Sequence, residues 1–202
     1  MKKKIVFIMN PISGTSSKAA VPSLIDSTLD KEQFEYEIKM TERPGHASEL
    51  AAEARDNHAD IVVAVGGDGT VNEVARSLVH SDSALGILPC GSGNGLARHL
   101  LLPMNLKKSI EIINACKIHD LDYGVINEYP FFCTCGMGFD AFVSMKFAES
   151  GKRGPISYAE NILREGLKYE PETYTLEDET GTKQHKAFLI SCANASQYGN
   201  NA

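Results

Sequence analysis

Short apolar runs alternate with amphipathic stretches along the first 115 residues of the chain. The apolar runs predict buried strands, and apolar residues at intervals of three and four predict helices between them. The predicted strands are residues 5–9, 36–40, 61–65 and 85–88. The predicted helices are residues 18–29, 47–57, 70–78 and 106–115. This order predicts an α/β fold, a Rossmann-like parallel sheet with right-handed crossovers and helices on both faces.

The pattern changes after residue 115. Residues 118–123 and the apolar run 129–135 predict strands, and residues 138–149 and 156–167 predict helices. Residues 174–176 and 187–192 predict strands of an antiparallel unit. We therefore expect an α/β domain over residues 1–128 and a β-rich second domain over residues 129–202. Since this second part has only about 70 residues and stops just after a strand, we expect it to be the truncated start of a longer domain.

Glycine, hydroxyl and amide residues follow each of the four predicted strands. The loops are Asn10-Pro11-Ile12-Ser13-Gly14, Thr41-Glu42-Arg43-Pro44-Gly45, Gly66-Gly67-Asp68-Gly69-Thr70 and Pro89-Cys90-Gly91-Ser92-Gly93-Asn94-Gly95. The carboxyl ends of parallel strands meet at one edge of a sheet, where ligands of such folds bind. Four loops of this composition on one edge predict a nucleotide-binding site.

The third loop carries the most specific signal. Its glycines let the backbone approach a ligand, and the free N–H groups at the start of the next helix favour an anion such as a phosphate. Asp68 is a candidate metal ligand or proton acceptor, with an Asx turn as the alternative. Thr70 and Glu73 have the spacing of a capping box. We therefore expect Thr70 to cap the following helix and Glu73 to be structural rather than catalytic.

The composition of the chain and the absence of two common nucleotide-binding motifs reduce the number of possible functions. A net charge of −6 offers no basic footprint for nucleic acid, and five cysteines without paired spacing favour a reducing compartment. The chain has no G-x-x-x-x-G-K-[ST] motif, and no G-x-G-x-x-G opens the first helix. Phosphates would therefore be held by backbone amides and hydroxyls. The candidates are Ser13, Gly14, Thr41, Gly67, Gly69, Thr70 and Ser92, with Asn10, Asn72 and Asn94 orienting the loops.

Features outside the four loops indicate where the protein works. The run 5–9 after three lysines is too short for a signal peptide, and no stretch is long enough to span a membrane, so we expect a cytoplasmic protein. The basic segment 151–155 favours a solvated turn over a phosphate contact. Phe139, Phe142 and Met145 recur at helical spacing and favour a core position. Their exposure, with formation of a homodimer, is the alternative.

Several of these motifs together resemble the diacylglycerol kinase catalytic-domain family of lipid kinases, which includes bacterial diacylglycerol kinases, sphingosine kinases and ceramide kinases. They are residues 10–14, the run 66–70 with Asn72-Glu73, residues 89–94 and Gly136-Met137-Gly138-Phe139-Asp140-Ala141. The resemblance implies a kinase that uses ATP and Mg²⁺, acts on a lipid hydroxyl and binds transiently to the inner membrane surface. By motif position, the ATP contacts would be Asn10, Pro11, Ile12, Ser13, Gly14, Thr41, Gly66, Gly67, Asp68, Gly69, Thr70, Val71, Asn72, Ser92 and Asn94. Asp68 would assist the metal or accept the proton of the attacking hydroxyl.

The fourth loop differs from the bacterial pattern. Bacterial diacylglycerol kinases usually have Asn-Asp where this chain has Asn94-Gly95, and its Gly-Ser-Gly-Asn-Gly run looks closer to sphingosine and ceramide kinases. Diacylglycerol and a sphingoid base therefore both stay open as acceptors. An NAD kinase-like enzyme, which has a similar Gly-Gly-Asp-Gly-Thr turn, and a non-catalytic ATP-binding regulatory module are the alternatives.

Overall fold

The computed structural model describes residues 2–14, 18–149 and 169–196, and the chain divides into two compact units. The first unit comprises Met1–Cys133 and Asn194–Ala202, and the second comprises Thr134–Ala193. The helix predicted over residues 156–167 and the basic segment 151–155 lie outside the described residues.

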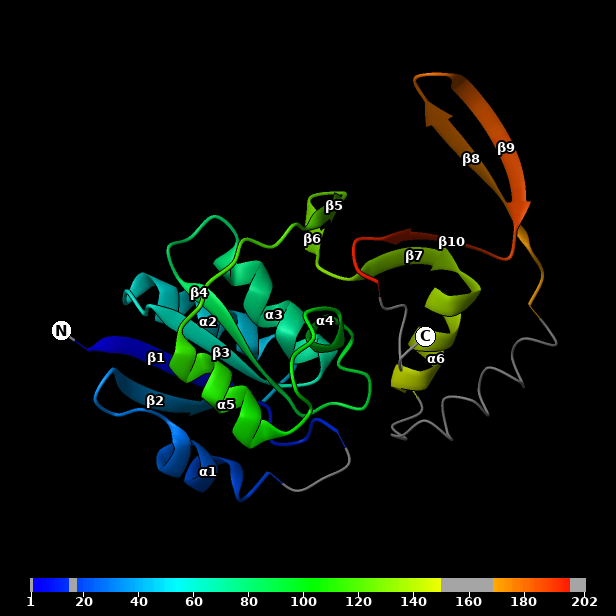
Figure 1. The fold of residues 1–202 in the computed structure, drawn as a ribbon. Coiled ribbons are helices and arrows are strands. Elements are labelled where there is room, and N and C mark those ends of the chain that lie inside the picture. Colours follow the sequence, from blue (N-terminus) through cyan, green and yellow to red (C-terminus); the bar gives the residue numbers. More distant parts are fainter. Residues whose placement is uncertain (1, 15–17, 150–168, 197–202) are drawn as a thin grey trace. The chain divides into compact units, whose positions relative to one another are not determined.

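Four parallel strands form the sheet of the first unit (Figure 1). They are β1 (Lys3–Met9), β2 (Phe34–Met40), β3 (Ile61–Gly66) and β4 (Ala84–Pro89), in the order β2-β1-β3-β4. Parallel neighbours need crossover connections, which the intervening helices supply. The predicted parallel α/β sheet is confirmed, and each strand end lies within two residues of its predicted position.

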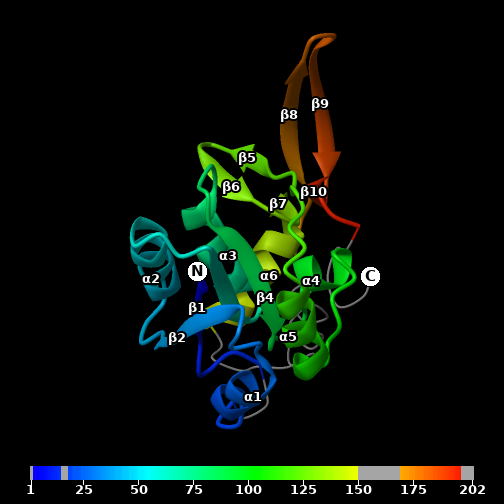
Figure 2. The same ribbon diagram turned by 60° about the vertical axis from the view of Figure 1, so that its left-hand side comes forward.

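Helices cover both faces of this sheet, as Figure 2 shows from a second direction. They are α1 (Val21–Thr28), α2 (His46–Asp56), α3 (Asp68–Leu78), the short α4 (Gly95–His99) and α5 (Leu106–Ala115). The prediction placed the start of the first helix at residue 18, which is too early. Pro22 lies in the first turn, where its missing N–H and fixed φ are tolerated, and the helix begins beside it. The short α4 was not predicted.

Each face of the sheet has its own hydrophobic core, because successive strand side chains point to opposite faces. On one face, Val6, Ile8 and Val62 pack with residues of α2, α3 and α4. On the other face, Phe7, Val63 and residues of α1 and α5 form the second core. The central strands β1 and β3 are buried on both faces, which explains their almost continuous apolar sequences.

The strand predicted over residues 118–123 is wrong. These residues form no strand in the structure, and Ile118 is 62% exposed. The first element of this region is instead the hairpin of β5 (Gly124–Ile126) and β6 (Tyr129–Phe131). Asn127 and Glu128 both have positive φ at its two-residue turn, which suits the twist of a tight hairpin. The apolar run 129–135 is therefore interrupted, and Phe132 turns into the first core.

The second unit contains antiparallel strand pairs and one helix. Its elements are β7 (Thr134–Gly138), α6 (Phe139–Glu149), β8 (Glu172–Asp178), β9 (Gly181–Ala187) and β10 (Leu189–Ala193). β7 pairs with β10, and β8 pairs with β9. The predicted strands and the helix from residue 138 are present, whereas the polar strand β9 was not predicted. Phe139 packs on Phe188 with ring centroids 4.6 Å apart, but Met145 is 50% exposed, so its predicted core position is wrong.

Within the described residues, no helix has both the length and the apolar character that crossing a membrane requires.

Candidate functional site

The four loops predicted to form the site all leave the sheet at the same edge. Residues 10–14 follow β1, residues 41–45 follow β2, residues 67–70 follow β3 and residues 90–94 follow β4. Because β1 to β4 are parallel, these are the carboxyl ends of all four strands. The expectation that the loops share one edge is confirmed.

The Asp68 carboxylate joins the third loop to the fourth. Its Oδ2 accepts a hydrogen bond from the Asn94 backbone N–H at 2.8 Å, and its Oδ1 accepts one from the Gly95 N–H at 2.6 Å. These two N–H groups lie at the start of α4. The carboxylate is exposed, and each oxygen keeps a further lone pair. Asp68 is therefore held in one orientation and is still accessible to a ligand.

Asn94 shapes the fourth loop so that its N–H reaches Asp68. Its Oδ1 accepts from the Gly91 N–H and its Nδ2 donates to the Gly91 carbonyl, both at 2.8 Å. The residue is buried and has φ of +57°, a left-handed conformation that asparagine tolerates better than most residues. The Nε of Arg98 donates to the Gly93 carbonyl at 2.9 Å and braces the same loop.

Backbone contacts at glycines interlock three of the loops. A Cβ added to Gly91 would lie 2.4 Å from the Gly67 Cα, so the third and fourth loops touch through their main chains. A Cβ added to Gly14, whose φ is +70°, would lie 2.2 Å from the Cys90 carbonyl oxygen. The first loop thus packs directly on the fourth. These glycines are required by close approach, which brings N–H groups of separate loops into one small region.

Asn10 organises the first loop and links it to α3. Its Oδ1 accepts from the Ile12 N–H at 3.1 Å, and its Nδ2 donates to the Thr70 Oγ1 at 3.3 Å. The Ser13 N–H and hydroxyl both donate to the Asn10 carbonyl. Ser13 and Thr70 are buried, whereas Pro11 and Ile12 are exposed. The hydroxyls of Ser13 and Thr70 thus lie within the loop framework.

The predicted capping box is wrong. Helix α3 begins at Asp68 with Gly67 as its N-cap, so Thr70 lies inside the first turn. The Glu73 carboxylate instead accepts from the backbone N–H groups of Gly45 and Ala47, both at 3.1 Å. It therefore caps the start of α2 rather than of its own helix, and fixes the loop that follows β2. Glu73 has a structural contact, as expected, but with a partner distant in sequence.

The other predicted residues have different surroundings. Thr41 is buried and its N–H donates to the Met9 carbonyl, while Ser92 and Gly69 are exposed. Gly66 is the last residue of β3, and Val71 is buried in the first core. The Asn72 Oδ1 is buried and has no hydrogen-bond partner among the described residues. Asn72 thus keeps an acceptor that an added donor would satisfy.

The contacts of three residues near the site were not expected from the sequence. The Gly95 N–H binds Asp68, and the Cys133 thiol lies close enough to Asp68 to be affected by its charge. Burial, and secondly the Asp68 charge, raise the pKa of Cys133 to about 11. The buried Lys18 contacts the Ser13 carbonyl through its ammonium group. Burial raises the pKa of the Cys90 thiol, and the Lys18 charge acts against that shift. The contacts of Asp68 join segments distant in sequence, so no local sequence signal could have indicated them, whereas Lys18 lies only five residues after Ser13.

The described residues offer limited possibilities for binding a metal. They contain no group of three or more His, Cys, Asp or Glu side chains that could hold an ion by themselves. Mg²⁺, however, is commonly bound through one or two carboxylates together with substrate phosphates and water. The exposed carboxylate of Asp68, beside the amides of the glycine loops, fits that kind of binding and not an all-protein cage.

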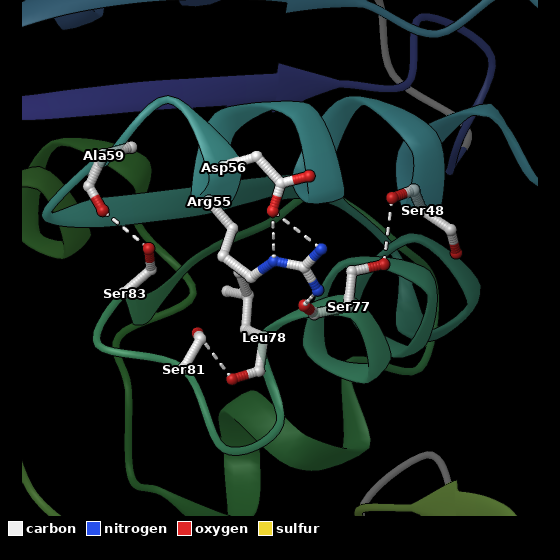
Figure 3. Close-up of polar contacts among 8 residues, drawn as sticks. All are labelled: Ser48, Arg55, Asp56, Ala59, Ser77, Leu78, Ser81 and Ser83. Atoms are coloured by element: carbon white, nitrogen blue, oxygen red, sulfur yellow. Dashed lines mark hydrogen bonds and ion pairs between the residues drawn. The ribbon is translucent and has the colours of Figure 1, made fainter.

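A separate cavity of about 330 Å³ lies at the opposite edge of the sheet. Its lining includes His58 and Ser83, from the segments just before β3 and β4. Figure 3 shows that several polar groups in this region are bonded within the protein. Ser83 Oγ donates to the Ala59 carbonyl at 2.6 Å, and Arg55 binds both the Asp56 carboxylate and the Ser77 carbonyl. These bonds join the ends of α2 and α3 to each other and the segments before β3 and β4 to each other, and they do not point to a ligand.

The comparisons with a family model and with known proteins agree on one family. The family model described as diacylglycerol kinase catalytic domain matches residues 4–126. A protein named diacylglycerol kinase from Staphylococcus saprophyticus is 32% identical over 163 residues, which cover 78% of this chain and 53% of the relative. A protein named "Probable lipid kinase YegS" from Escherichia fergusonii is 29% identical, over 85% of this chain and 60% of the relative. The chain thus spans between half and two thirds of the length of these relatives.

The fold also matches solved structures. A crystal structure of a diacylglycerol kinase from Bacillus anthracis aligns with a TM-score of 0.72 and 23% sequence identity, covering 98% of this chain and 66% of that one. At this identity the likeness concerns the fold, including both the parallel sheet and the β-rich part that follows it.

Proposed function

We propose a function from one premise: the chain belongs to the diacylglycerol kinase catalytic domain family. Its relatives are named diacylglycerol kinase and probable lipid kinase, so we assign the protein to the lipid kinases. We propose further that the protein uses ATP, and that it transfers the γ-phosphate to a lipid hydroxyl. A diacylglycerol or a sphingoid base is the proposed acceptor.

The observation that carries the proposal is the fixed, exposed carboxylate of Asp68 among interlocked glycine loops. Phosphoryl transfer depends mainly on positioning and on neutralising charge, with little covalent chemistry for the protein. Backbone N–H groups at the glycine loops and at the start of α3 suit the phosphates of a nucleotide. The bonds from Asn94 and Gly95 would hold Asp68 in place while the reaction proceeds.

Each loop has a proposed part in binding ATP. The first loop, through Ser13 and Gly14, and the third, through Gly67, Gly69 and Thr70, would hold phosphates. Thr41 and Ser92 would add hydroxyl contacts from the second and fourth loops. Asn10 and Asn94 would keep the loops in register, and the unsatisfied Oδ1 of Asn72 would accept a bond when the site is filled.

We propose Asp68 as the residue that would hold Mg²⁺, or that would accept the proton of the attacking hydroxyl. When bound, Mg²⁺ would neutralise charge on the β- and γ-phosphates. The two N–H bonds orient both carboxylate oxygens, so either role uses the same fixed geometry. A lipid acceptor also implies contact with a membrane surface during the reaction.

The test is phosphate transfer from γ-labelled Mg-ATP, with a diacylglycerol, a sphingoid base and NAD offered in parallel. We expect label on one lipid, and a loss of about 10²-fold or more in Asp68→Asn. Asp82→Asn is the matched control, because Asp82 is an exposed aspartate beside the cavity at the opposite sheet edge. Label on NAD alone would favour an NAD kinase-like enzyme. ATP binding without transfer to any acceptor would favour the regulatory module.

A further inference from the structure

An exposed apolar loop lies directly after α4, beside the proposed catalytic site. It consists of residues 100–104, Leu-Leu-Leu-Pro-Met, which we term the apolar loop. Leu101 is 88% exposed, and Leu100 and Met104 are 39% and 37% exposed. The Met104 sulfur lies 3.9 Å from the Asn94 Nδ2, so the loop adjoins the residue that holds the fourth glycine loop together.

The backbone conformation at Leu101 is one in which an exposed leucine is unusual. The Leu102 N–H donates to the Ala97 carbonyl and the Leu101 N–H to the Arg98 carbonyl, at 2.8 and 3.0 Å. This is the Schellman pattern at a helix end, in which the residue at the Leu101 position adopts positive φ and is usually glycine. Leu101 has φ of +55°. A bulky side chain is thus placed in a strained conformation and pointed into solvent, which folding alone would not favour.

Packing and hydrogen bonds on its C-terminal side fix the apolar loop to the rest of the first unit. Leu102 packs against the first core, and the Pro103 carbonyl accepts from the Ser109 hydroxyl at 2.7 Å. Asn105 then caps α5 by accepting from the Lys108 N–H. The backbone at Leu101 is therefore held in place by its neighbours, so the loop would lose little conformational entropy if the Leu101 side chain became buried on binding.

The charged side chains nearest the apolar loop in sequence are basic, whereas the acidic neighbours are Glu111, one turn further along α5, and Asp68, which binds the start of α4. The sequence has no acidic residue between Asp82 and Glu111, although the whole chain has a net charge of −6. Lys107 and Lys108 are exposed in the first turn of α5, and neither forms an ion pair among the residues that the structure describes. The helix dipole favours acidic residues at that position, so these lysines do not serve helix stability.

We propose that the apolar loop, with Lys107 and Lys108, is the surface through which the protein docks on an anionic lipid bilayer. Leu101 would enter the interface between headgroups and acyl chains, and the two lysines would lie among the anionic headgroups. The inference rests on the proposed function, since it explains how a lipid hydroxyl would come near Asp68. The combination of an apolar tip with flanking positive charge fits a bilayer better than an apolar protein groove.

The test is co-sedimentation of the purified protein with vesicles of phosphatidylcholine, with and without phosphatidylglycerol. We expect binding to the anionic vesicles that weakens as salt is raised. Leu101→Gly should reduce the partition coefficient about tenfold, the effect of losing one buried leucine side chain. The double variant Lys107→Gln/Lys108→Gln should lower binding to anionic vesicles by about tenfold or more. The matched controls are Ile118→Gly, which removes another exposed apolar side chain, and Lys2→Gln/Lys117→Gln, which removes two other exposed lysines.

Thermal unfolding separates docking from folding. Leu101→Gly places glycine where glycine is usual, so its unfolding temperature should be equal to or higher than that of the unaltered protein. Binding that falls while stability holds would support the proposal. Equal vesicle binding by Leu101→Gly and the unaltered protein, a loss in the controls as large as in the loop variants, or no binding to any vesicle would each overturn it.

Vesicle binding needs no phosphate transfer, so its outcome is independent of the proposed function. Loop-dependent binding by a protein that phosphorylates no lipid would refute the kinase proposal and leave the docking surface standing. Transfer to a detergent-dispersed lipid, with vesicle binding unaffected by Leu101→Gly, would do the reverse.

Discussion

Removing the Glu73 carboxylate should destabilise the loop between β2 and α2. Glu73 accepts from the N–H groups of Gly45 and Ala47, both at 3.1 Å, at the positive end of α2. A hydrogen bond to a charged group contributes about 1.5–3 kcal/mol, and Glu73 is only half-buried, so water would replace part of the loss. We therefore expect Glu73→Ala to lower the free energy of unfolding by about 2–4 kcal/mol, from two such bonds. Glu73→Gln keeps an acceptor but loses the charge, and should cost about 1 kcal/mol.

Two measurements check this prediction. Urea unfolding followed by circular dichroism gives the global change, and amide hydrogen exchange gives the local one. Exchange at Gly45 and Ala47 should accelerate in Glu73→Ala by roughly tenfold for each 1.4 kcal/mol lost. Glu49→Ala is the matched control, because Glu49 is an exposed acid in the first turn of the same helix and pairs with Arg43 at the surface. Such surface pairs contribute little.

A loss in Glu73→Ala no larger than that in Glu49→Ala would refute the reasoning. The same would follow if Gly45 and Ala47 exchanged at unaltered rates in Glu73→Ala. If Glu73 acted only within its own helix, as a capping box, exchange would change at the start of α3 and not at the start of α2.

Three other predictions concern the glycine loops and the Cys133 thiol beside Asp68. Gly91→Ala should disrupt the loops and weaken ATP binding, because the added Cβ would lie 2.4 Å from the Gly67 Cα. In Gly69→Ala the added Cβ meets no atom within 4 Å, so the thermal stability of this variant should be equal to or higher than that of the unaltered protein. The Cys133 thiol, with a pKa of about 11, should alkylate slowly with iodoacetamide at pH 8, followed by peptide mass spectrometry. Asp68→Asn should speed that alkylation, because removing the negative charge lowers the pKa of Cys133; an unchanged rate would contradict the contact. Since burial raises this pKa above its unfolded value near 9, the contribution of Cys133 to stability should be complete below pH 9 and fall as the pH rises through 11.

The parallel sheet was predictable because its signals are local. The strands β1 and β3 are buried on both faces, so their sequences are continuous apolar runs, and the helices between them show clear amphipathic spacing. The shared position of the four loops followed from topology, since parallel strands place their carboxyl ends at one edge. The composition of the four loops was enough to select this candidate site once the strand order was known.

The details that failed depend on partners distant in sequence. Glu73 has the spacing of a capping box, but the free N–H groups of Gly45 and Ala47 lie within its reach once α2 and α3 pack together. The binding of Asp68 by the Gly95 N–H joins residues 27 positions apart, and only the folded loops bring them together. Strand β9 has no apolar alternation, and it pairs with β8 through its backbone.

The central claim is that the carboxyl edge of the four-stranded sheet binds the nucleotide. Its most direct test is amide hydrogen exchange with and without Mg-ATP. We predict slower exchange in residues 10–14, 41–45, 66–72 and 91–95, and none of this protection in Asp68→Asn if Asp68 holds the metal. Exchange at residues 58–60 and 81–83, beside the cavity at the opposite edge, should not change. Protection at those residues, with none at the four loops, would contradict the account.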